Sequence, residues 1–542
     1  MLLYCRTSWL LLSRLEVLQD RVQSDLMDYF WIFSAETWTL LLLFTSLLLL
    51  YGYWPYKYFV KLGIPGPKPL PLFGTMLEYR KGFHAFDMEC YRKYGKIWGI
   101  FDGREPVLSI ADQTIVKSIL VKECYTYFTN RRDVGLNGEL YDALFVTKDE
   151  DWKRIRNHLS PSFTSGRLKE MFGIMKTHTN TLVKNLEKSS KNTEGVAVKE
   201  VFGAYSMDVI TSTAFSVDID SMNNPKDPFV TNIKKMLDID FLSPIFIIAM
   251  VFPFALPLLE NMKISFFPQS VSDFFLGSLK KIKTEREAKN HKSRVDILQL
   301  MVDSQTEDYI TLHYITFGRR FCPKRLTIVN DHEILSQSMS FIFAGYETSS
   351  STLSFFFYNI ATNPETMKKL QQEIDQTFPN KTPVNYDAVM NMEYLEAALN
   401  ESMRLFPVVA RLERVCKETI EINGLTIPQG TSIMIPVFPL HRDPEYWSDP
   451  STFNPERFTK GNKENVDPYV YMPFGSGPRN CIGMRFALLA MKLAIVEILQ
   501  RFDVPLKLGI HPFLSPKYPI KLKFIPRANS SSGEPNNNQV KS

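Results

Sequence analysis

The sequence reads FGSGPRNCIG over Phe474–Gly483, and a helical pattern follows it at once. This short stretch places one cysteine, Cys481, among glycines that let the backbone approach a flat partner closely. The free N–H groups and positive dipole of a helix N-terminus favour a thiolate there. Arg479 adds a cation two residues before the sulfur. Cys481 is therefore a candidate thiolate ligand, and the alternative is a structural cysteine buried in a glycine-rich turn.

The whole-chain composition narrows the class of protein. The chain has 542 residues, 45% of them hydrophobic, and 63 basic against 58 acidic residues give a net charge of +5. This composition excludes a disordered or fibrous protein, and the charge is too diffuse to indicate nucleic-acid binding. The six cysteines lack paired spacing, which argues against a disulfide framework or a zinc site and fits a reducing compartment.

A soft thiolate at the start of a helix suits a haem iron as an axial ligand. The segment around Cys481 resembles the haem-binding loop of the cytochrome P450 family, Phe-x-x-Gly-x-Arg-x-Cys-x-Gly, without a mismatch. The resemblance covers residues 37 to 526. It implies a mainly α fold with small β-sheets and haem b as the cofactor. It also implies that Cys481 binds the iron, with Phe474 and Arg479 in the haem site.

A second matching segment is AGYET, Ala344–Thr348. Ala344 and Thr348 lie four residues apart and share one helix face. The resemblance implies that Ala344 leaves room for dioxygen above the haem. It further implies that Thr348 donates a hydrogen bond to bound oxygen and that Glu347 relays protons through water. Taken alone, the segment is also compatible with an ordinary helix that carries an incidental threonine.

Basic residues elsewhere match family positions that hold the haem propionates. Trp152 and Arg156 are spaced i,i+4 and can reach one carboxylate. Arg131, Arg414 and Arg479 match further such positions, and an arginine fork binds a carboxylate through two hydrogen bonds. Each arginine taken singly is also compatible with a solvated surface residue.

A structural network is implied by two other segments. Glu401 and Arg404 lie three residues apart, so they can pair on a helix face. The segment Pro455–Phe458 contains Arg457, which in the family joins that pair in a buried network behind the haem. Without this context an ordinary surface ion pair is the simpler interpretation.

Several longer strings place the chain near family 3, subfamily A, of vertebrate microsomal cytochromes P450. Among them are FTNRR, EDWKRIR, FIFAGYETSS and VFPLHRDPEYW. The resemblance implies oxidation of lipophilic steroids and xenobiotics. It also implies electrons from NADPH through a flavoprotein reductase, with possible help from cytochrome b5. The segments expected to line the substrate pocket are Val134–Phe145, Ile239–Met250, Phe343–Thr348 and Val408–Ala410.

The residues from Thr37 to Trp54 form an uncharged, leucine-rich stretch with aromatic ends. Its length and composition predict a single transmembrane anchor, and a signal peptide is the alternative. Lys57, Lys61 and Lys68 follow it, so the positive-inside rule places the catalytic domain in the cytoplasm, at the endoplasmic reticulum membrane that the resemblance implies. A later apolar stretch, Phe241–Leu259, is broken by three prolines and predicts short helices that rest on the membrane.

The sequence thus divides into five parts. They are an N-terminal extension (1–36), the anchor (37–54), a proline-rich linker (55–71), a haem-binding monooxygenase domain (72–528) and a polar disordered tail (529–542). Within the domain the patterns predict strand structure over 97–110, with turns at Gly99 and Gly103. They predict helices over 331–362, 390–405 and 484–501.

One segment departs from the family pattern. The region Phe317–Arg325 reads as an insertion before the helix expected to start at Asn330 or Asp331 with Glu333. A benign exposed loop is the first interpretation, because long surface insertions cost little entropy. The alternative is that it disturbs the central helix and leaves a poorly active or non-enzymatic haem protein. A haem-thiolate isomerase is a further alternative, which the Glu347–Thr348 pair argues against.

Overall fold

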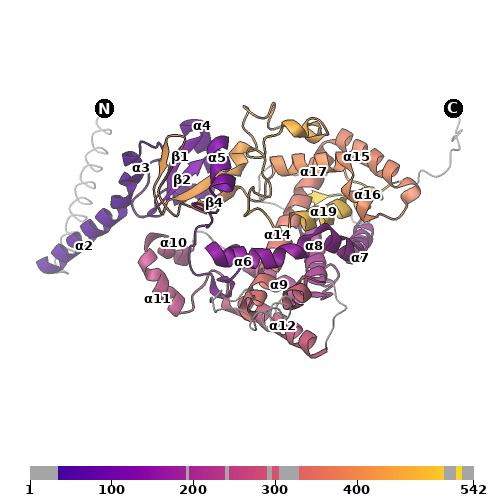
Figure 1. The fold of residues 1–542 in the computed structure, drawn as a ribbon, viewed down its shortest axis with the longest axis horizontal. Helices are drawn as coiled ribbons and strands as arrows, with labels where there is room; N and C mark the ends of the chain where they lie inside the picture. Colours follow the sequence, from indigo (N-terminus) through magenta and orange to yellow (C-terminus); the bar gives the residue numbers. More distant parts are fainter. Residues whose placement is uncertain are drawn as a thin grey trace, which may run out of the picture.

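The computed structural model describes residues 34–190, 195–237, 243–289, 296–303, 329–505 and 520–527. The predicted insertion at 317–325, the tail at 529–542 and the extension before Ser34 lie outside the described residues. Figure 1 shows a mainly helical body with a small sheet region at the end from which the N-terminal helix projects.

The helices account for most of the described chain. Their bounds are α2 (Ala35–Tyr53), α3 (Lys57–Lys61), α4 (Phe83–Tyr94), α5 (Gln113–Lys117), α6 (Asp149–Leu159), α7 (Ser165–Ser189), α8 (Val198–Phe215), α9 (Pro228–Leu237), α10 (Pro244–Val251), α11 (Leu256–Asn261), α12 (Gln269–Lys289), α14 (Asp331–Thr362), α15 (Pro364–Thr377), α16 (Tyr386–Met390), α17 (Glu393–Leu405), α18 (Val437–Leu440) and α19 (Met484–Leu499).

The strands form one larger sheet and three small pairs. Their bounds are β1 (Ile97–Asp102), β2 (Glu105–Ile110), β3 (Val196–Ala197), β4 (Arg411–Val415), β5 (Ile420–Ile422), β6 (Leu425–Ile427), β7 (Ser432–Pro436), β8 (Phe502–Asp503), β9 (Lys521–Leu522) and β10 (Ile525–Pro526). The larger sheet has the order β1-β2-β7-β4, with β2 and β7 parallel and the other neighbours antiparallel. The mainly α fold with small sheets is therefore confirmed.

The hairpin of β1 and β2 corrects one predicted turn. Gly103 sits at the turn with φ of 60°, as expected. Gly99 does not form a turn but lies inside β1, paired with Leu108. A Cβ on Gly99 would come within 2.3 Å of the Phe59 ring. The glycine therefore serves close packing within the strand.

Helix α14 crosses the centre of the molecule (Figure 1) and begins where the sequence predicted. Asn330 and Glu333 form a reciprocal capping box at its start, and Asn363 followed by Pro364 ends it. Most of its side chains are buried among those of α8, α17 and α19 in one hydrophobic core. The predicted helix over 331–362 is confirmed at both ends.

The helix predicted over 390–405 starts later than expected. α16 ends at Met390, Asn391 forms a turn, and α17 begins at Glu393. The N–H groups of Tyr394 and Leu395 donate to the carboxylate of Glu373 on α15. This acceptor caps the new helix start from a distant element, which a local sequence pattern cannot reveal.

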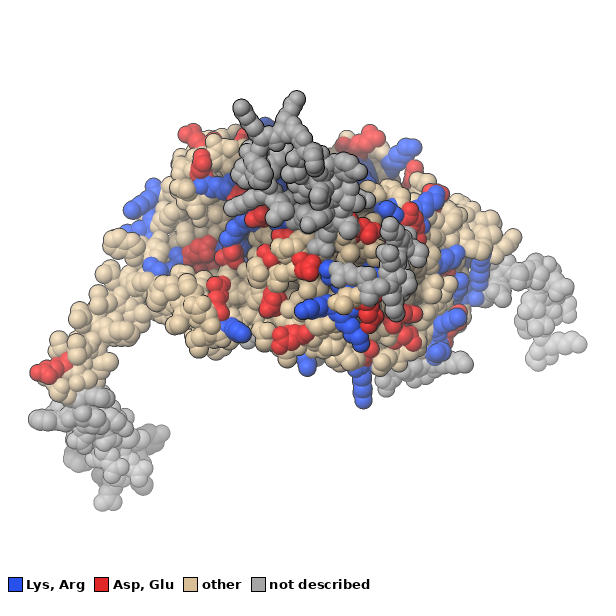
Figure 2. Space-filling model, turned by 60° about the horizontal axis from the view of Figure 1, so that its bottom comes forward, with Lys and Arg blue, Asp and Glu red and all other residues tan. Residues whose placement is uncertain are grey.

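The N-terminal helix projects from the body as an arm of mostly uncharged side chains (Figure 2). In the described part of the chain, the helical stretch Ala35–Lys61 is long and apolar enough to cross a membrane, and 6% of its most apolar window is buried. The later apolar stretch forms α10, a 3-10 turn at Pro253–Ala255 and α11, bent by 107° at the break. The prolines therefore divide it into short helices, as predicted.

Candidate functional site

Cys481 lies at the end of a tightly closed loop that leads into α19. Its N–H donates to the carbonyl of Phe474 at 2.9 Å, which fixes the loop at its base. Gly475 and Gly477 have φ of 74° and 76°, values that favour glycine. Gly483 caps the start of α19. The glycines of the motif thus shape the loop that presents the sulfur.

The Cys481 side chain is exposed, in contrast to the buried thiols of Cys90, Cys124 and Cys416. Desolvation by the surrounding protein raises the pKa of Cys481, and the Gly483 N–H, Arg156 and Arg131 oppose that rise. Among the described residues no three His, Cys, Asp or Glu side chains converge as a metal cage. Of the four cysteines in the described residues, Cys481 therefore offers the exposed sulfur to a ligand.

Replacing Gly477 by alanine should disrupt this loop. A Cβ at Gly477 would lie 1.9 Å from the carbonyl oxygen of Leu120, at a φ that strains any L side chain. We expect a loss of about 2–3 kcal/mol in unfolding free energy and a weaker hold on a ligand at Cys481. Gly483→Ala is the matched control, because its nearest neighbour is 3.9 Å away and its φ is −86°. Urea unfolding measures the stability, and the haem content of the purified protein measures the hold on the ligand. Equal values for the two variants would contradict the prediction.

Four arginines surround the Cys481 loop. Arg156 binds Asn480 twice, through its carbonyl at 2.8 Å and its side-chain oxygen at 2.9 Å. Arg131 contacts the Arg479 carbonyl at 3.4 Å, and Arg479 donates to the carbonyl of Thr147. Arg414 lies close enough to Arg131 and Arg479 for mutual charge repulsion. The five residues Cys481, Arg131, Arg156, Arg414 and Arg479, which sequence reasoning grouped, are thus brought together.

These guanidinium groups form no ion pair with a carboxylate in the described part of the chain, and their charges are costly. Burial, followed by neighbouring arginines, lowers the pKa of Arg479 to about 9 and that of Arg414 to about 10. Burial also lowers the pKa of Arg131. The Arg479 Nε and Nη1 and the Arg414 Nε are buried without a hydrogen-bond acceptor. Because buried cations need an anion, the cluster is suited to a ligand with carboxylate groups.

Trp152 supports the cluster from α6. Its ring is buried at 2% exposure, and the Arg479 guanidinium lies 4.6 Å from the ring centroid. This geometry is a cation–π contact, which stabilises a partly desolvated cation. Trp152 therefore positions Arg479, while the expectation that it also contacts the cofactor stays a prediction.

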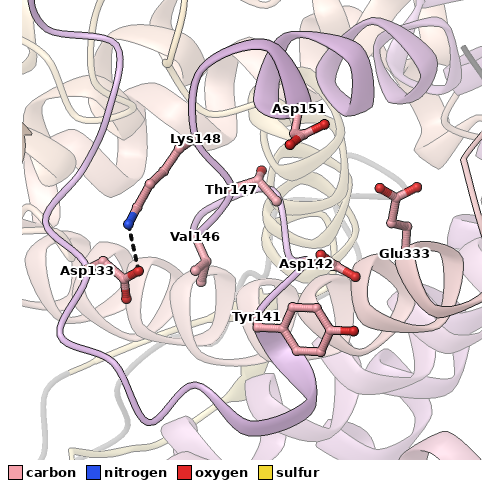
Figure 3. A pocket seen from close by; sticks show the side chains of 8 residues that line it. All are labelled: Asp133, Tyr141, Asp142, Val146, Thr147, Lys148, Asp151 and Glu333. Carbon is pink, nitrogen blue, oxygen red and sulfur yellow. Dashed lines mark hydrogen bonds and ion pairs between the residues drawn. The ribbon is translucent and has the colours of Figure 1, made fainter. Parts of the chain in front are cut away.

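An acidic depression of about 330 Å³ lies beside the cluster, between the segment 133–148 and the start of α14 (Figure 3). Its carboxylates already have partners within the protein. Lys148 binds Asp133 at 2.8 Å, Arg154 binds Glu333 and Asp151, and His332 contacts Asp142 at 2.8 Å. These pairs hold the segment 133–148 and α6 against the start of α14. The depression is therefore a structural contact between these elements.

On α14, Ala344 is exposed although its neighbours Phe341 and Ile342 are buried. The hydroxyl of Thr348 donates to the Ala344 carbonyl at 2.8 Å, so both residues share one face as predicted. The carboxylate of Glu347 is not free but pairs with Lys199 of α8 at 2.6 Å. Sequence reasoning missed Lys199, which stands 148 residues before its partner.

Aromatic side chains gather next to this face. Phe343 stacks with Phe145 at 6.4 Å between ring centroids, and Phe267 meets Phe343 edge-on at 6.0 Å. Two of the predicted pocket segments therefore touch through Phe145 and Phe343. Phe267 was missed, since it lies beyond the predicted segment 239–250, whose residues 239–242 are outside the described residues. Val408 and Val409 of the fourth segment are exposed.

The Glu401–Arg404 pair is fully buried, as the sequence predicted. Arg404 binds both carboxylate oxygens of Glu401 at 2.7 and 2.8 Å and donates to the carbonyls of His441 and Pro450 at 2.8 Å each. Arg457 approaches Glu401 at 3.4 Å. The three charged groups form one network that ties α17 to the segment leading to Cys481.

The buried His441 imidazole makes this network sensitive to acid. Burial, and then the charges of Arg404 and Arg442, lower its pKa from 6.5 to about 3. Its Nε2 accepts the Met472 N–H at 3.0 Å. Between pH 6.5 and 3 the unfolded chain binds a proton that the folded chain does not, so stability falls as the pH falls, by about 1.4 kcal/mol per pH unit.

Urea unfolding at pH 7, 6 and 5 measures that slope. His441→Gln should show a flatter dependence over the same range, because it removes the group that titrates only on unfolding. An unchanged slope in His441→Gln would show that other groups cause the acid sensitivity.

Comparison with known proteins agrees with the geometry. A sequence model described as Cytochrome P450 matches residues 64–524. The chain is 61% identical over 510 residues to Cytochrome P450 3A56 of Fundulus heteroclitus, covering 93% of this chain and 100% of the relative. It is 59% identical to Cytochrome P450 3A27 of Oncorhynchus mykiss, over 94% of this chain and 98% of the relative. It is 50% identical to Cytochrome P450 3A9 of Rattus norvegicus, over 92% and 99%.

Proposed function

The chain belongs to the cytochrome P450 family, and on that premise we propose that it is a membrane-anchored monooxygenase whose Cys481 binds the haem iron. Members of this family are haem-dependent monooxygenases, so the chain is an oxidoreductase that acts on lipophilic substrates. The observation that carries the residue assignment is the convergence of unpaired buried arginines around one exposed thiol.

The residues present fit haem. Its two propionates would supply the carboxylates that Arg131, Arg156, Arg414 and Arg479 lack. The glycines of the loop carry no side chains, so a flat ring can approach the backbone and Cys481 closely. Phe474 lies at the base of the loop. Asn480 is held by Arg156, so a ligand at the sulfur would meet a fixed loop.

When bound, haem supplies the activation of dioxygen and the insertion of one oxygen atom into a substrate C–H bond. The chain's own residues hold and tune that site. The Cys481 thiolate would hold the iron and donate electron density to it, and Ala344 keeps its side of α14 open. The Thr348 hydroxyl, which donates to the Ala344 carbonyl in this structure, would offer a hydrogen bond at this face, and Glu347 would hold or move protons at its carboxylate oxygens.

The aromatic wall of Phe145, Phe267 and Phe343 supports large lipophilic substrates, since apolar and aromatic linings dominate such pockets. We assign steroids and xenobiotics as the substrate class from the similarity to subfamily 3A. Electrons then come from NADPH through NADPH-cytochrome P450 reductase, with cytochrome b5 as a second donor. We expect no nucleic acid among the partners of the protein.

The anchor and the apolar segment α10–α11 support a membrane location. Ile245 and Ile248 of α10, Phe254 of the 3-10 turn and Leu258 of α11 are exposed, and the Tyr51 hydroxyl of α2 donates to the Val251 carbonyl at 3.0 Å. These contacts place two apolar surfaces next to each other. We propose insertion in the endoplasmic reticulum membrane with the domain over 72–528 in the cytoplasm, connected by the linker over 55–71.

The alternative of a poorly active protein rested on the insertion at 317–325. That segment lies outside the described residues. α14, the helix it was expected to disturb, runs without interruption from a complete capping box. This continuity favours the active enzyme.

Reconstitution with the reductase in lipid vesicles tests the function. We expect NADPH-dependent oxidation products from a panel of steroids and lipophilic drugs. Product formed without NADPH or reductase would instead indicate isomerase chemistry. A haem-loaded protein that oxidises none of the panel, while a subfamily relative does so in parallel, would contradict the proposal.

A further inference from the structure

An ammonium group from α8 meets the Glu347 carboxylate on α14. The Lys199 Nζ lies 2.6 Å from Glu347 Oε1 and 3.3 Å from the Glu347 carbonyl oxygen. It also lies 3.0 Å from the Ser350 hydroxyl and 2.5 Å from the Ser351 hydroxyl. The Ser351 hydroxyl is itself 3.0 Å from Glu347 Oε1. All contacts of this one lysine therefore converge on a single turn of α14.

Two glycines at the helix crossing make this reach possible. A Cβ at Gly203 of α8 would lie 2.8 Å from the Tyr346 hydroxyl. A Cβ at Gly345 of α14 would lie 3.2 Å from Ile210. Larger residues at these positions would separate the helices. The close approach of α8 and α14 brings Lys199 into contact with Glu347, the residue after Tyr346.

The rotation of the helix places Glu347 between the face of Ala344 and Thr348 and the face that packs on α8. Successive residues are about 100° apart around a helix, so Glu347 is offset by that angle from Thr348. Tyr346, on its other side, faces α8. The carboxylate can therefore turn toward the face of Ala344 and Thr348 or toward α8, and in this structure Lys199 holds it at α8.

The positive charge of the partly buried Lys199 is stabilised by its partner, Glu347. Burial lowers the pKa of Lys199, and the Glu347 charge opposes that effect. The Tyr346 phenol also interacts electrostatically with Glu347 and with Glu200. The lysine and glutamate side chains retain 34% and 41% exposure, so water reaches both groups.

We propose that Lys199 is a positioning residue for proton delivery, which holds the Glu347 carboxylate in contact with water beside the face of Ala344 and Thr348. The proposal rests on the proposed function. Lys199 does not contact the reacting atoms but sets where the Glu347 carboxylate waits and keeps a path to solvent. The hydroxyl groups of Ser350 and Ser351 hold the lysine ammonium in place, so the ion pair returns to one geometry after each proton transfer.

The first test measures coupling in the reconstituted holoenzyme. Lys199→Met should release about three- to tenfold more hydrogen peroxide per NADPH oxidised than the parent and show a larger solvent isotope effect on product formation, because general acid–base steps are sensitive to placement. Lys199→Arg should restore most of the coupling. Lys188→Met, which removes an exposed lysine of the neighbouring helix α7, should behave as the parent. Parental coupling in Lys199→Met would overturn the proposal.

The second test reads the pair without turnover. Amine labelling of the holoprotein, quantified at Lys199 by mass spectrometry, should rise about threefold in Glu347→Gln, since the lysine loses its carboxylate. Equal labelling in the two proteins would overturn the proposal even if Lys199→Met failed to fold. The double variant should couple no worse than Glu347→Gln alone, and additive losses would show that the residues act separately. A parent that lacks turnover altogether would instead refute the proposed function and leave the labelling result to judge the ion pair.

Discussion

Cys481→Ser should abolish oxidation of any substrate that the parent enzyme accepts. A serine oxygen is a harder and weaker donor than a thiolate, so the site loses its iron ligand and the electron donation that the ligand provides. We expect a fall of at least about a hundredfold, beyond the ten- to hundredfold that is common when only an outer partner of a metal ligand is removed. NADPH-dependent product formation by equal amounts of folded protein is the measurement.

Cys416→Ser is the matched control for this change. Cys416 is buried, and its sulfur lies 2.9 Å from the Glu418 carbonyl, a contact that a serine hydroxyl can keep. Its activity should stay close to that of the parent. Comparable activity in Cys481→Ser and Cys416→Ser would remove Cys481 from the site.

Arg404→Met should cause the largest loss of stability. Both Arg404 and Glu401 have fully buried side chains, so removing the guanidinium leaves the Glu401 carboxylate with only the more distant Arg457 as a cation and the carbonyls of His441 and Pro450 without their donor. Breaking such a buried pair costs about 3–5 kcal/mol, a large part of the roughly 5–15 kcal/mol that stabilises a typical domain. The midpoint of urea unfolding and the yield of folded protein should both fall sharply.

An exposed ion pair provides the comparison for Arg404→Met. Lys369 and Glu456 are 2.7 Å apart with side chains 55% and 49% exposed. Lys369→Met should leave the midpoint of urea unfolding close to that of the parent, because solvent screens that pair. If the two variants unfolded at the same urea concentration, the buried network would not support the fold as described.

Much of the fold and site could be predicted from local sequence. The Cys481 loop follows from glycines at fixed offsets, and the ends of α14 follow from Asn330, Glu333 and the Asn363-Pro364 pair. These signals work because capping and positive φ are properties of a few adjacent residues. The grouping of arginines around Cys481 came from the family resemblance, and the structure brings the same side chains together.

Other features depend on contacts that adjacent residues do not encode. The start of α17 is set by Glu373, and the place of Gly99 is set by the Phe59 ring. Lys199 and Phe267 join the site through helix crossings, so no spacing in the sequence marks them. Arg414 and Arg479 also reveal their need for an anion only when their burial and missing partners are known.

We propose that Cys481 binds a haem iron as a thiolate. The most direct measurement is the absorption spectrum of the reduced, carbon monoxide-bound holoprotein. The account predicts the long-wavelength Soret band that gives the family its name, present in the parent and in Cys416→Ser and absent in Cys481→Ser. A Soret band at that position in Cys481→Ser, or its absence from a haem-loaded, folded parent, would contradict the account.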